Sequence, residues 1–326
     1  MAKIVVTGAG GFIGSNMLKF LKEKGHFVRA VDKSFRPERK ELYNYADEVV
    51  GFDLRDFKSS FLAVHGMEYV IHLASDMGGV GYFSANDYTP YLNNMTMDMN
   101  ILQACQSMHV KRLYYSSSAC IYPINLQMRE GEAPKLEENL LNYSADADQM
   151  YGWEKLMMTK LCARAPFNTR VGIQHTIFGP YQETEGERMK FPTAIATKAL
   201  RAFAATKDDR AVEEDHIIEI WGNGKQIRTF TYIDDCLEKI YEVLMAKEYH
   251  GAVNIGSEEE VTVDDVAKMC CEILGIEPKF NHTKDKPSGV LARGCSNKKY
   301  NTYYKYRNKF STKQGFEKLL LWLQNR

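Results

Sequence analysis

Short apolar runs alternate with helix-length amphipathic segments throughout the first half of the chain. The segment Ser15–Lys24, for example, places Met17, Leu18 and Leu21 on one helical face, and Gly25 ends it. The apolar runs, which have the length of buried strands, are Lys3–Thr7, Phe27–Val31, Glu48–Phe52, Tyr69–Ala74, Arg112–Ser117 and Gly172–Phe178. Strands that alternate with helices in this way predict an α/β fold with a doubly wound parallel sheet.

The alternation loosens after about Pro180, where polar loops become more frequent. The helices expected there are Pro192–Ala205, Thr262–Leu274 and Gly315–Gln324, and the acidic stretch Lys207–His216 is most simply an exposed loop. We therefore predict two domains. The larger comprises residues 1–175, and a smaller α/β domain is made mainly of residues 176–326, with some of the chain crossing back to the sheet.

Acidic and basic residues balance, with 42 of each among 326 residues. The protein therefore has no overall field that would draw it to nucleic acid or to an anionic membrane. The basic, tyrosine-rich run Lys298–Lys309 is similar to a segment that contacts RNA through charge and stacking. Without a global basic excess, we predict no nucleic-acid partner and no membrane partner.

The cysteine, histidine and apolar patterns bear on where the protein works in the cell and on whether it contains disulfides or a metal site. No apolar run is long enough to span a bilayer, and residues Met1–Gly11 lack the features of a signal peptide. The seven cysteines show no spacing typical of a disulfide framework, and the eight histidines are scattered. We expect reduced thiols, a cytoplasmic location and no metal site.

A glycine-rich segment connects the first expected strand to the first expected helix. Glycines at such a junction let the backbone turn tightly and bring its N–H groups close to a pyrophosphate. We predict that this segment binds a dinucleotide through Gly8, Gly11, Phe12, Ile13 and Gly14. The alternative is a glycine turn that only packs the helix on the sheet.

Two carboxylates follow later strands and bear on the choice of cofactor. Asp32 can accept hydrogen bonds from the adenosine ribose hydroxyls, and its charge would repel a ribose phosphate, which favours NAD over NADP. Lys33 and Arg36 lie nearby in the sequence and could bind such a phosphate, so the preference is not absolute. Asp53 is placed to hydrogen-bond the adenine, although capping of the following helix would explain it equally well.

A phenol and an ammonium, Tyr151 and Lys155, are four residues apart and so share one face of an expected helix. A tyrosine with its usual pKa of about 10 is a poor base at neutral pH, but a neighbouring lysine and a nicotinamide cation both favour the phenolate. Ser118 ends a strand and would hydrogen-bond the reacting oxygen, although strand-end capping is an alternative. These residues predict oxidation of a hydroxyl group.

The glycine pattern, the strand end at Ser118 and Tyr151-x-x-x-Lys155 together resemble the extended short-chain dehydrogenases/reductases that act on nucleotide sugars. The resemblance covers essentially the whole chain. It implies a Rossmann domain that binds NAD, a smaller C-terminal domain that binds a nucleotide sugar, and a homodimer. Within the family, the stretches Ser75–Gly79, Ser118–Pro123 and Glu187–Pro192 are most similar to the GDP-mannose 3,5-epimerases.

This resemblance assigns roles to further residues, with a GDP-hexose as ligand. Tyr151 would be the base for oxidation at C4 and Lys155 its electrostatic partner, while Cys120 and Lys190 would exchange protons at C3 and C5. Re-reduction at C4 would then return NAD. Thr176 stands where the family has an asparagine. The implied substrate contacts are Gly78, Ser118, Ala119, Cys120, Thr176, Lys190, Lys198, Gln226, Arg228 and Arg293.

Other interpretations stay open on the sequence alone. Cys120 could be a small buried core residue and Lys190 a surface lysine. The enzyme alternatives are a 4-epimerase or a 4,6-dehydratase acting on another nucleotide sugar. The non-enzyme alternative is an NAD-binding scaffold or sensor, because a fold does not fix a function.

Overall fold

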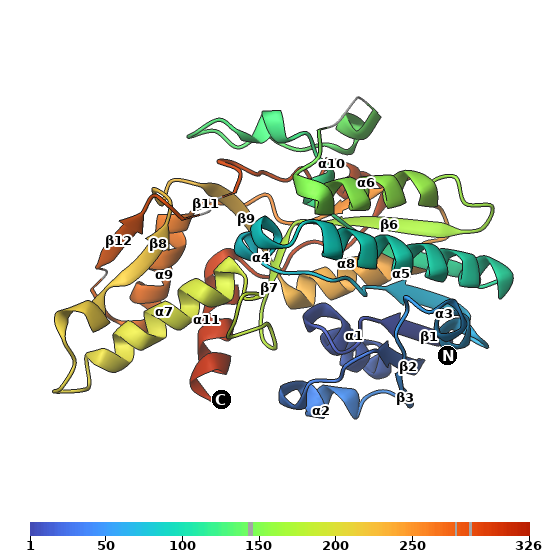
Figure 1. Ribbon diagram of the computed structural model, residues 1–326, viewed down its shortest axis with the longest axis horizontal. Helices are drawn as coiled ribbons and strands as arrows, with labels where there is room; N and C mark the ends of the chain where they lie inside the picture. The colour runs from blue at the N-terminus through green and yellow to red at the C-terminus, as the bar shows by residue number, and fades with distance from the viewer. Residues whose placement is uncertain (143–145, 278, 287–288) are drawn as a thin grey trace.

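The centre of the fold is a seven-stranded sheet (Figure 1), seen in a computed structural model that describes residues 1–142, 146–277, 279–286 and 289–326. Its strands are β1 (Lys3–Thr7), β2 (Phe27–Asp32), β3 (Glu48–Gly51), β4 (Tyr69–His72), β5 (Arg112–Ser118), β6 (Thr169–Gln174) and β10 (Val253–Ile255). They lie in the order β10-β6-β5-β4-β1-β2-β3, and every neighbouring pair is parallel. The predicted doubly wound parallel sheet is confirmed.

Helices cover both faces of this sheet. They are α1 (Phe12–Glu23), α2 (Lys40–Tyr43), α3 (Phe57–Val64), α4 (Val80–Ala85), α5 (Tyr88–Ser107), α6 (Gln149–Cys162), α8 (Ile233–Met245) and α10 (Lys298–Tyr303). Because successive strand residues point to opposite faces, Ile4 and Val6 join the core with α1 and α8, whereas Val5 joins the core with α3 and α5. Helices α5 and α6 lie side by side on the second face (Figure 1).

Two smaller sheets with their own helices lie beside the large one. Strands β7 (Thr176–Phe178), β9 (Ile227–Tyr232) and β11 (Glu260–Thr262) form one sheet, and β8 (Ile218–Trp221) and β12 (Phe280–Thr283) form the other. The helices α7 (Phe191–Ala205), α9 (Val263–Leu274) and α11 (Thr312–Gln324) pack together against them (Figure 1). The chain returns from this region to the large sheet at β10. The expected boundary near residue 175 stays a prediction.

One expected strand is wrong in its extent. The apolar run Gly172–Phe178 is divided between two sheets, because β6 ends at Gln174 and β7 starts at Thr176. Gln174 pairs with Ile255 of the large sheet, whereas Thr176 pairs with Phe230 of the three-stranded sheet. A change of partner strand leaves no trace in the apolar pattern, so periodicity alone predicted one continuous strand.

The tyrosine-rich run near the C-terminus contributes to the core. Its first residues form α10, where Tyr300 is fully buried and its hydroxyl donates to Glu242 at 2.7 Å. The Tyr306 hydroxyl donates to Asp235 at 2.6 Å. These two rings are therefore engaged by the protein itself. Separately, none of the helices in the described ranges is long and apolar enough to cross a membrane.

The strand order places a crevice at the carboxyl ends of β1 and β4. These strands are neighbours, yet the chain proceeds from β1 towards β2 on one side and from β4 towards β5 on the other. In open α/β sheets, ligands bind at such a reversal, where the loops diverge and leave room. The glycine segment follows β1, so the fold brings it to this point.

Candidate active site

The glycine segment makes contacts that only glycine allows. Gly8 has a positive φ of 71°, and a Cβ there would lie 2.6 Å from the backbone nitrogen of Ala74, just beyond β4. A Cβ on Gly14 would lie 2.1 Å from the Gly8 carbonyl oxygen. Gly11 precedes α1 without a side-chain cap, which leaves the first N–H groups of the helix to a ligand. These features fit a dinucleotide pyrophosphate.

A cavity of about 440 Å³ opens next to this loop. Its wall includes Phe12, Asp32, Asp53, Ser75 and Lys190, so it joins the predicted cofactor residues to one predicted acid/base residue. Ile13 lies in the first turn of α1 and is half-buried. The crevice is thus continuous from the end of β2 to the start of α7.

Asp32 is held in place by backbone donors. Its Oδ2 accepts a hydrogen bond from the N–H of Gly10 at 2.9 Å, and its Oδ1 accepts one from Ser34 at 3.0 Å. Burial raises the pKa of Asp32, and these hydrogen bonds oppose that effect. The carboxylate therefore stands fixed at the cavity wall, where it retains lone pairs for ribose hydroxyls.

Asp53 does not cap the following helix. Its carboxylate forms a salt bridge with Arg55 at 2.5 Å, and hydrogen bonding from this guanidinium lowers the pKa of Asp53 to about 2. Helix α3 is capped instead by Asp56, which accepts from the N–H of Ser59 at 2.8 Å. The capping explanation of Asp53 is wrong, and adenine recognition stays a prediction.

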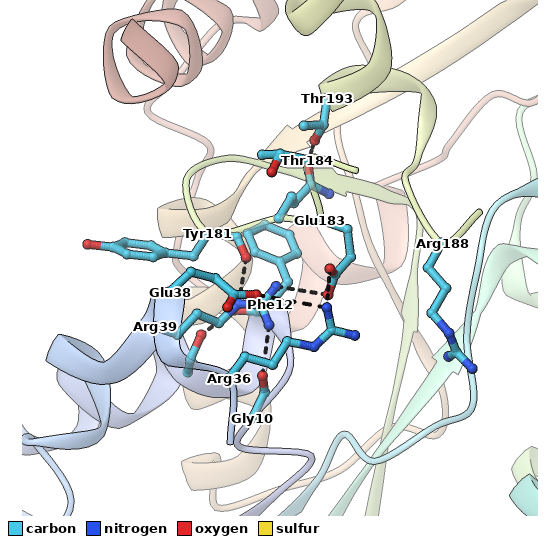
Figure 2. Close-up of polar contacts among 12 residues, drawn as sticks. Gly10, Phe12, Arg36, Glu38, Arg39, Tyr181, Glu183, Thr184, Arg188 and Thr193 are labelled. Carbon is cyan, nitrogen blue, oxygen red and sulfur yellow. Dashed lines mark hydrogen bonds and ion pairs between the residues drawn. The ribbon is translucent and has the colours of Figure 1, made fainter. Parts of the chain in front are cut away.

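A buried guanidinium ties the glycine loop to the segment after β7, as Figure 2 shows. Arg39, only 1% exposed, donates to the carbonyl oxygens of Gly10 at 2.9 Å and Tyr181 at 2.8 Å, and to Glu183 at 3.0 Å. The other oxygen of Glu183 accepts from Arg36. Arg36, which the sequence left as a possible phosphate ligand, is therefore already paired. Sequence reasoning missed Arg39 and Glu183, since no pattern marks a charged side chain that will be buried.

Tyr151 and Lys155 are both buried on α6 and lie on the same side of the helix. The Lys155 ammonium is 5.7 Å from the centroid of the Tyr151 ring, which stacks on Phe83 with centroids 4.8 Å apart. Burial raises the pKa of Tyr151, while Lys155 and a hydrogen bond from Ser118 lower it. The three predicted catalytic residues are thus brought together.

Cys120 reaches the same place from the turn after β5. It lies in a short 3₁₀ helix, Ala119–Ile121, and is half-buried. Its sulfur is 3.3 Å from Nη1 of Arg293, whose Nη2 forms a 2.6 Å salt bridge with Asp148. The turn and α6 touch so closely that a Cβ on Gly152 would lie 2.4 Å from the Cys120 carbonyl oxygen. Cys120 therefore lies half-buried beside a charged pair and outside the apolar core, and its catalytic role stays a prediction. Asp148 is a partner of Arg293 that the sequence did not reveal.

Lys190 immediately precedes α7 and is half-buried. Burial lowers the pKa of Lys190, and Cys120 is near enough to oppose that effect. The stretch that carries Lys190 is anchored by Arg188, which pairs with Asp76 at 2.8 Å and donates to the Met77 carbonyl at 3.0 Å. The motif stretches Ser75–Gly79 and Glu187–Pro192 therefore lie against each other.

The other predicted substrate residues divide into three groups. Arg228 lies near Arg293, and burial together with this neighbouring charge lowers the pKa of Arg228 to about 10. Lys198 instead pairs with Glu219 on β8 at 3.0 Å, and Gln226 donates to the Trp221 carbonyl at 3.4 Å. Three further predicted contacts occupy tight positions: Gly78 against the Tyr82 ring, Ala119 in the buried turn, and Thr176 at the start of β7.

Histidine, cysteine and acidic side chains do not gather into a metal site anywhere in the described parts of the chain. The cavity wall provides the glycine loop, the fixed carboxylate of Asp32 and the Lys190 ammonium, and the elements that carry the Tyr151 phenol and the Cys120 thiol contact each other. This set can hold an anionic dinucleotide and move protons at a second ligand beside it.

Comparison with known proteins gives a consistent result. Residues 4–256 match the NAD dependent epimerase/dehydratase family. The chain is 33% identical over 328 residues to a GDP-mannose 3,5-epimerase of Arabidopsis thaliana, spanning 99% of this chain and 82% of the plant protein. It is 32% identical to GDP-mannose 3,5-epimerase 1 of Oryza sativa subsp. japonica, with the same coverage.

A solved structure has the same fold. The UDP-glucose 4-epimerase of Thermotoga maritima, crystallised with UDP-glucose, superimposes with a TM-score of 0.83 at 21% identity. The match covers 99% of this chain and 98% of the Thermotoga chain.

Replacing Arg39 with alanine is expected to destabilise the protein. The change leaves the carbonyls of Gly10 and Tyr181 without their donor. It also removes one of the two guanidinium partners of Glu183 and leaves Arg36 as the other. We expect a loss of about 3 kcal/mol in the free energy of unfolding, measured by urea denaturation. Arg36→Ala is the matched control: this side chain is 40% exposed and its loss should cost less than about 1 kcal/mol. Equal losses in the two variants would contradict the assigned role of Arg39.

Proposed function

Because this chain belongs to the NAD dependent epimerase/dehydratase family and is an NAD-dependent nucleotide-sugar epimerase, we propose that its substrate is GDP-mannose and that it inverts C3, C5 or both. The reaction would pass through a transient 4-keto sugar. One observation carries the proposal: the Cys120 thiol lies 3.3 Å from the Arg293 guanidinium and within electrostatic range of both the Tyr151 phenol and the Lys190 ammonium. The names of the plant relatives support the same substrate.

Tyr151 would remove the proton of the C4 hydroxyl. Ser118 would hold the reacting oxygen, and the Lys155 ammonium would stabilise the phenolate by charge. NAD, bound at the glycine loop, supplies a hydride acceptor that later returns the hydride. The positive nicotinamide ring would favour the phenolate further, in opposition to the burial that raises the pKa of Tyr151.

Cys120 and Lys190 would exchange protons once C4 is a ketone. The hydrogens at C3 and C5 are then both α to a carbonyl, so they become acidic enough for side chains to remove. Inversion of a carbon requires one group to take the proton and another to deliver it from the opposite face. The Arg293 guanidinium, 3.3 Å from the sulfur, can stabilise a thiolate through a charge-assisted hydrogen bond.

The remaining assignments concern the GDP moiety of the substrate and the NAD cofactor. Arg228 and Arg293 would contact the diphosphate, a task that suits guanidinium forks. Asp32 would bind the ribose of NAD, and Asp53 would bind its adenine. The pyrophosphate of NAD would lie against the glycine segment, which comprises Gly8, Gly11, Phe12, Ile13 and Gly14. Further substrate contacts would come from Gly78, Ala119, Thr176, Lys198 and Gln226.

We also propose that the protein is a homodimer formed through α5 and α6. These adjacent helices expose large apolar side chains, although surface helices normally present polar ones. On α6, Trp153, Met157 and Leu161 are four residues apart and so form one stripe. On α5, Leu92 and Met99 are about half exposed. A second copy of the same surface is the simplest partner for two such helices.

Incubation with GDP-mannose and NAD in deuterated water tests the proposed reaction. We expect deuterium at C3 or C5 together with a new epimer, detected by NMR of the sugar. Cys120→Ala should still form enzyme-bound NADH at close to the normal rate but lose most of the ring-proton exchange, by about 100-fold.

Other outcomes identify the alternatives. An unlabelled sugar inverted only at C4 would indicate a 4-epimerase, and a 6-deoxy-4-keto product would indicate a dehydratase. If no panel of nucleotide sugars produces enzyme-bound NADH, the protein is a scaffold or sensor and the proposed activity is wrong.

Gly152→Ala is expected to lower turnover by about 100-fold, because the new methyl would push α6 from the Cys120 turn and separate Tyr151 from Cys120. Steady-state kinetics would measure this loss. Gly51→Ala serves as a control, since a Cβ at Gly51 meets no atom within 4 Å. Normal turnover by Gly152→Ala would show that the close approach is dispensable.

Met157→Glu is expected to convert the dimer to monomers, because it places charges in the centre of an apolar contact. Sedimentation velocity should then report half the mass of the unmodified protein. Leu321→Glu is the control: Leu321 is 60% exposed on α11, compared with 52% for Met157, and its change should leave the dimer intact. A monomeric parent protein would refute the proposed interface.

A further inference from the structure

A group of ionisable side chains lies behind Lys155, on the side away from solvent. The Lys155 nitrogen is 3.1 Å from the Tyr115 hydroxyl, 3.3 Å from Oε1 of Glu154 and 3.6 Å from Oδ2 of Asp98. The Lys155 side chain is 3% exposed, and both carboxylates are fully buried. Two acids therefore share a single ammonium in a space without solvent.

The hydrogen bonds of the two acids are unequal. Asp98 accepts hydrogen bonds from the Tyr115 hydroxyl at 2.7 Å and from Nε2 of His72 at 2.9 Å, and it forms an ion pair with Lys155 at 3.6 Å. Nδ1 of His72 lies 2.6 Å from the Thr7 hydroxyl, so a neutral imidazole can accept from Thr7 and donate to Asp98. Asp98 therefore has two hydrogen-bond donors and, in addition, the neighbouring charge of Lys155.

Glu154 has far less support for a negative charge. Its Oε2 has no hydrogen-bond partner among the described residues, and its Oε1 lies 3.3 Å from the Lys155 nitrogen and 3.1 Å from the Tyr115 oxygen. Tyr115 has one proton, and the shorter contact directs it to Asp98. An ionised Glu154 would therefore face a lone pair of Tyr115, whereas a protonated Glu154 can donate to that oxygen.

From this geometry we propose that Glu154 is a neutral carboxylic acid in the resting enzyme and that Asp98 alone is the counterion of Lys155. Asp98 is thus a positioning residue, which holds the ammonium under the Tyr151 ring. Glu154 can ionise and become the counterion of Lys155 if the Asp98 charge is lost. The link to catalysis rests on the proposed role of Tyr151, but the protonation state does not.

The electrostatic environment agrees with this assignment. Burial and the Asp98 charge raise the pKa of Glu154 to about 8, against the effect of Lys155. Burial opposes ionisation of Asp98, but Lys155 and His72 outweigh it and lower the pKa of Asp98. The titratable groups around Glu154 are Lys155 and Tyr151 on α6, Asp98 on α5, Tyr115 on β5 and His72 on β4, with the Cys162 thiol beside Asp98 and Lys155.

Infrared spectroscopy of the whole enzyme, without sugar, tests the protonation state directly. We expect the C=O band of a protonated carboxylic acid at pH 7, which disappears as the pH is raised through about 8. Labelling of glutamate side-chain carboxyls with carbon-13 should shift this band, and labelling of aspartate should not. Glu154→Gln should remove it. Asp98→Asn should also remove it, because Glu154 then ionises to balance Lys155.

Absence of the band in the unmodified enzyme at pH 7, or a band that shifts with aspartate labelling, would overturn the proposal. This result does not depend on whether GDP-mannose is the substrate, so it is distinct from a failure of the proposed function.

A double-mutant cycle tests the positioning role. At pH 7, Glu154→Gln should form enzyme-bound NADH within about twofold of the normal rate, and Asp98→Asn within about tenfold. The double variant leaves Lys155 with no anion, so we expect a loss of at least about 100-fold and an upward shift of about one unit in the acidic limb of the pH profile. Each variant is first checked for an intact fold by urea denaturation.

A merely structural role would produce additive losses without movement of the pH profile, and that outcome would overturn the positioning role. A large loss in Glu154→Gln alone would contradict the neutral state of Glu154.

Discussion

The contact between Gly152 on α6 and the backbone of Cys120 is the constraint on which the rest of the site depends. Only a residue without a side chain lets α6 lie against the turn after β5. This approach brings together the two elements that carry the Tyr151 phenol and the Cys120 thiol. In the proposed reaction, the phenol would serve as the base at C4 and the thiol would transfer a proton at an adjacent carbon of the same sugar ring, with NAD as the hydride acceptor.

Buried charges fix the parts that meet in this crevice. Arg39 joins the glycine loop to the segment after β7, and the Lys155 cluster joins α6 to α5, β4 and β5. A charge without solvent needs partners at defined distances, because its desolvation is costly unless hydrogen bonds and opposite charges offset it. Both clusters therefore tie together elements that are far apart in the chain.

Much of the fold was predictable because its signals are local. Short apolar runs located the parallel strands, patterns with a period of 3.6 residues located the main helices, and the glycine segment marked the junction of β1 with α1. The run Gly172–Phe178 was misjudged, since it changes partner strand at His175 without a change in pattern. The role of Asp53 was also ambiguous, because two aspartates precede α3 in the sequence. Asp56, three residues after Asp53, proved to be the cap.

The sequence by itself determined the class of chemistry, because cofactor loops and a Tyr-x-x-x-Lys pair depend on spacing within a single turn or helix. It also indicated Cys120 and Lys190, through short motifs that resemble a known family. Only the tertiary structure decided which charges are paired: Glu183 with Arg36 and Arg39, Arg293 with Cys120 and Asp148, and Asp98 with Lys155. Such pairs join residues far apart in the chain, and their energy depends on burial and distance, which no local pattern records.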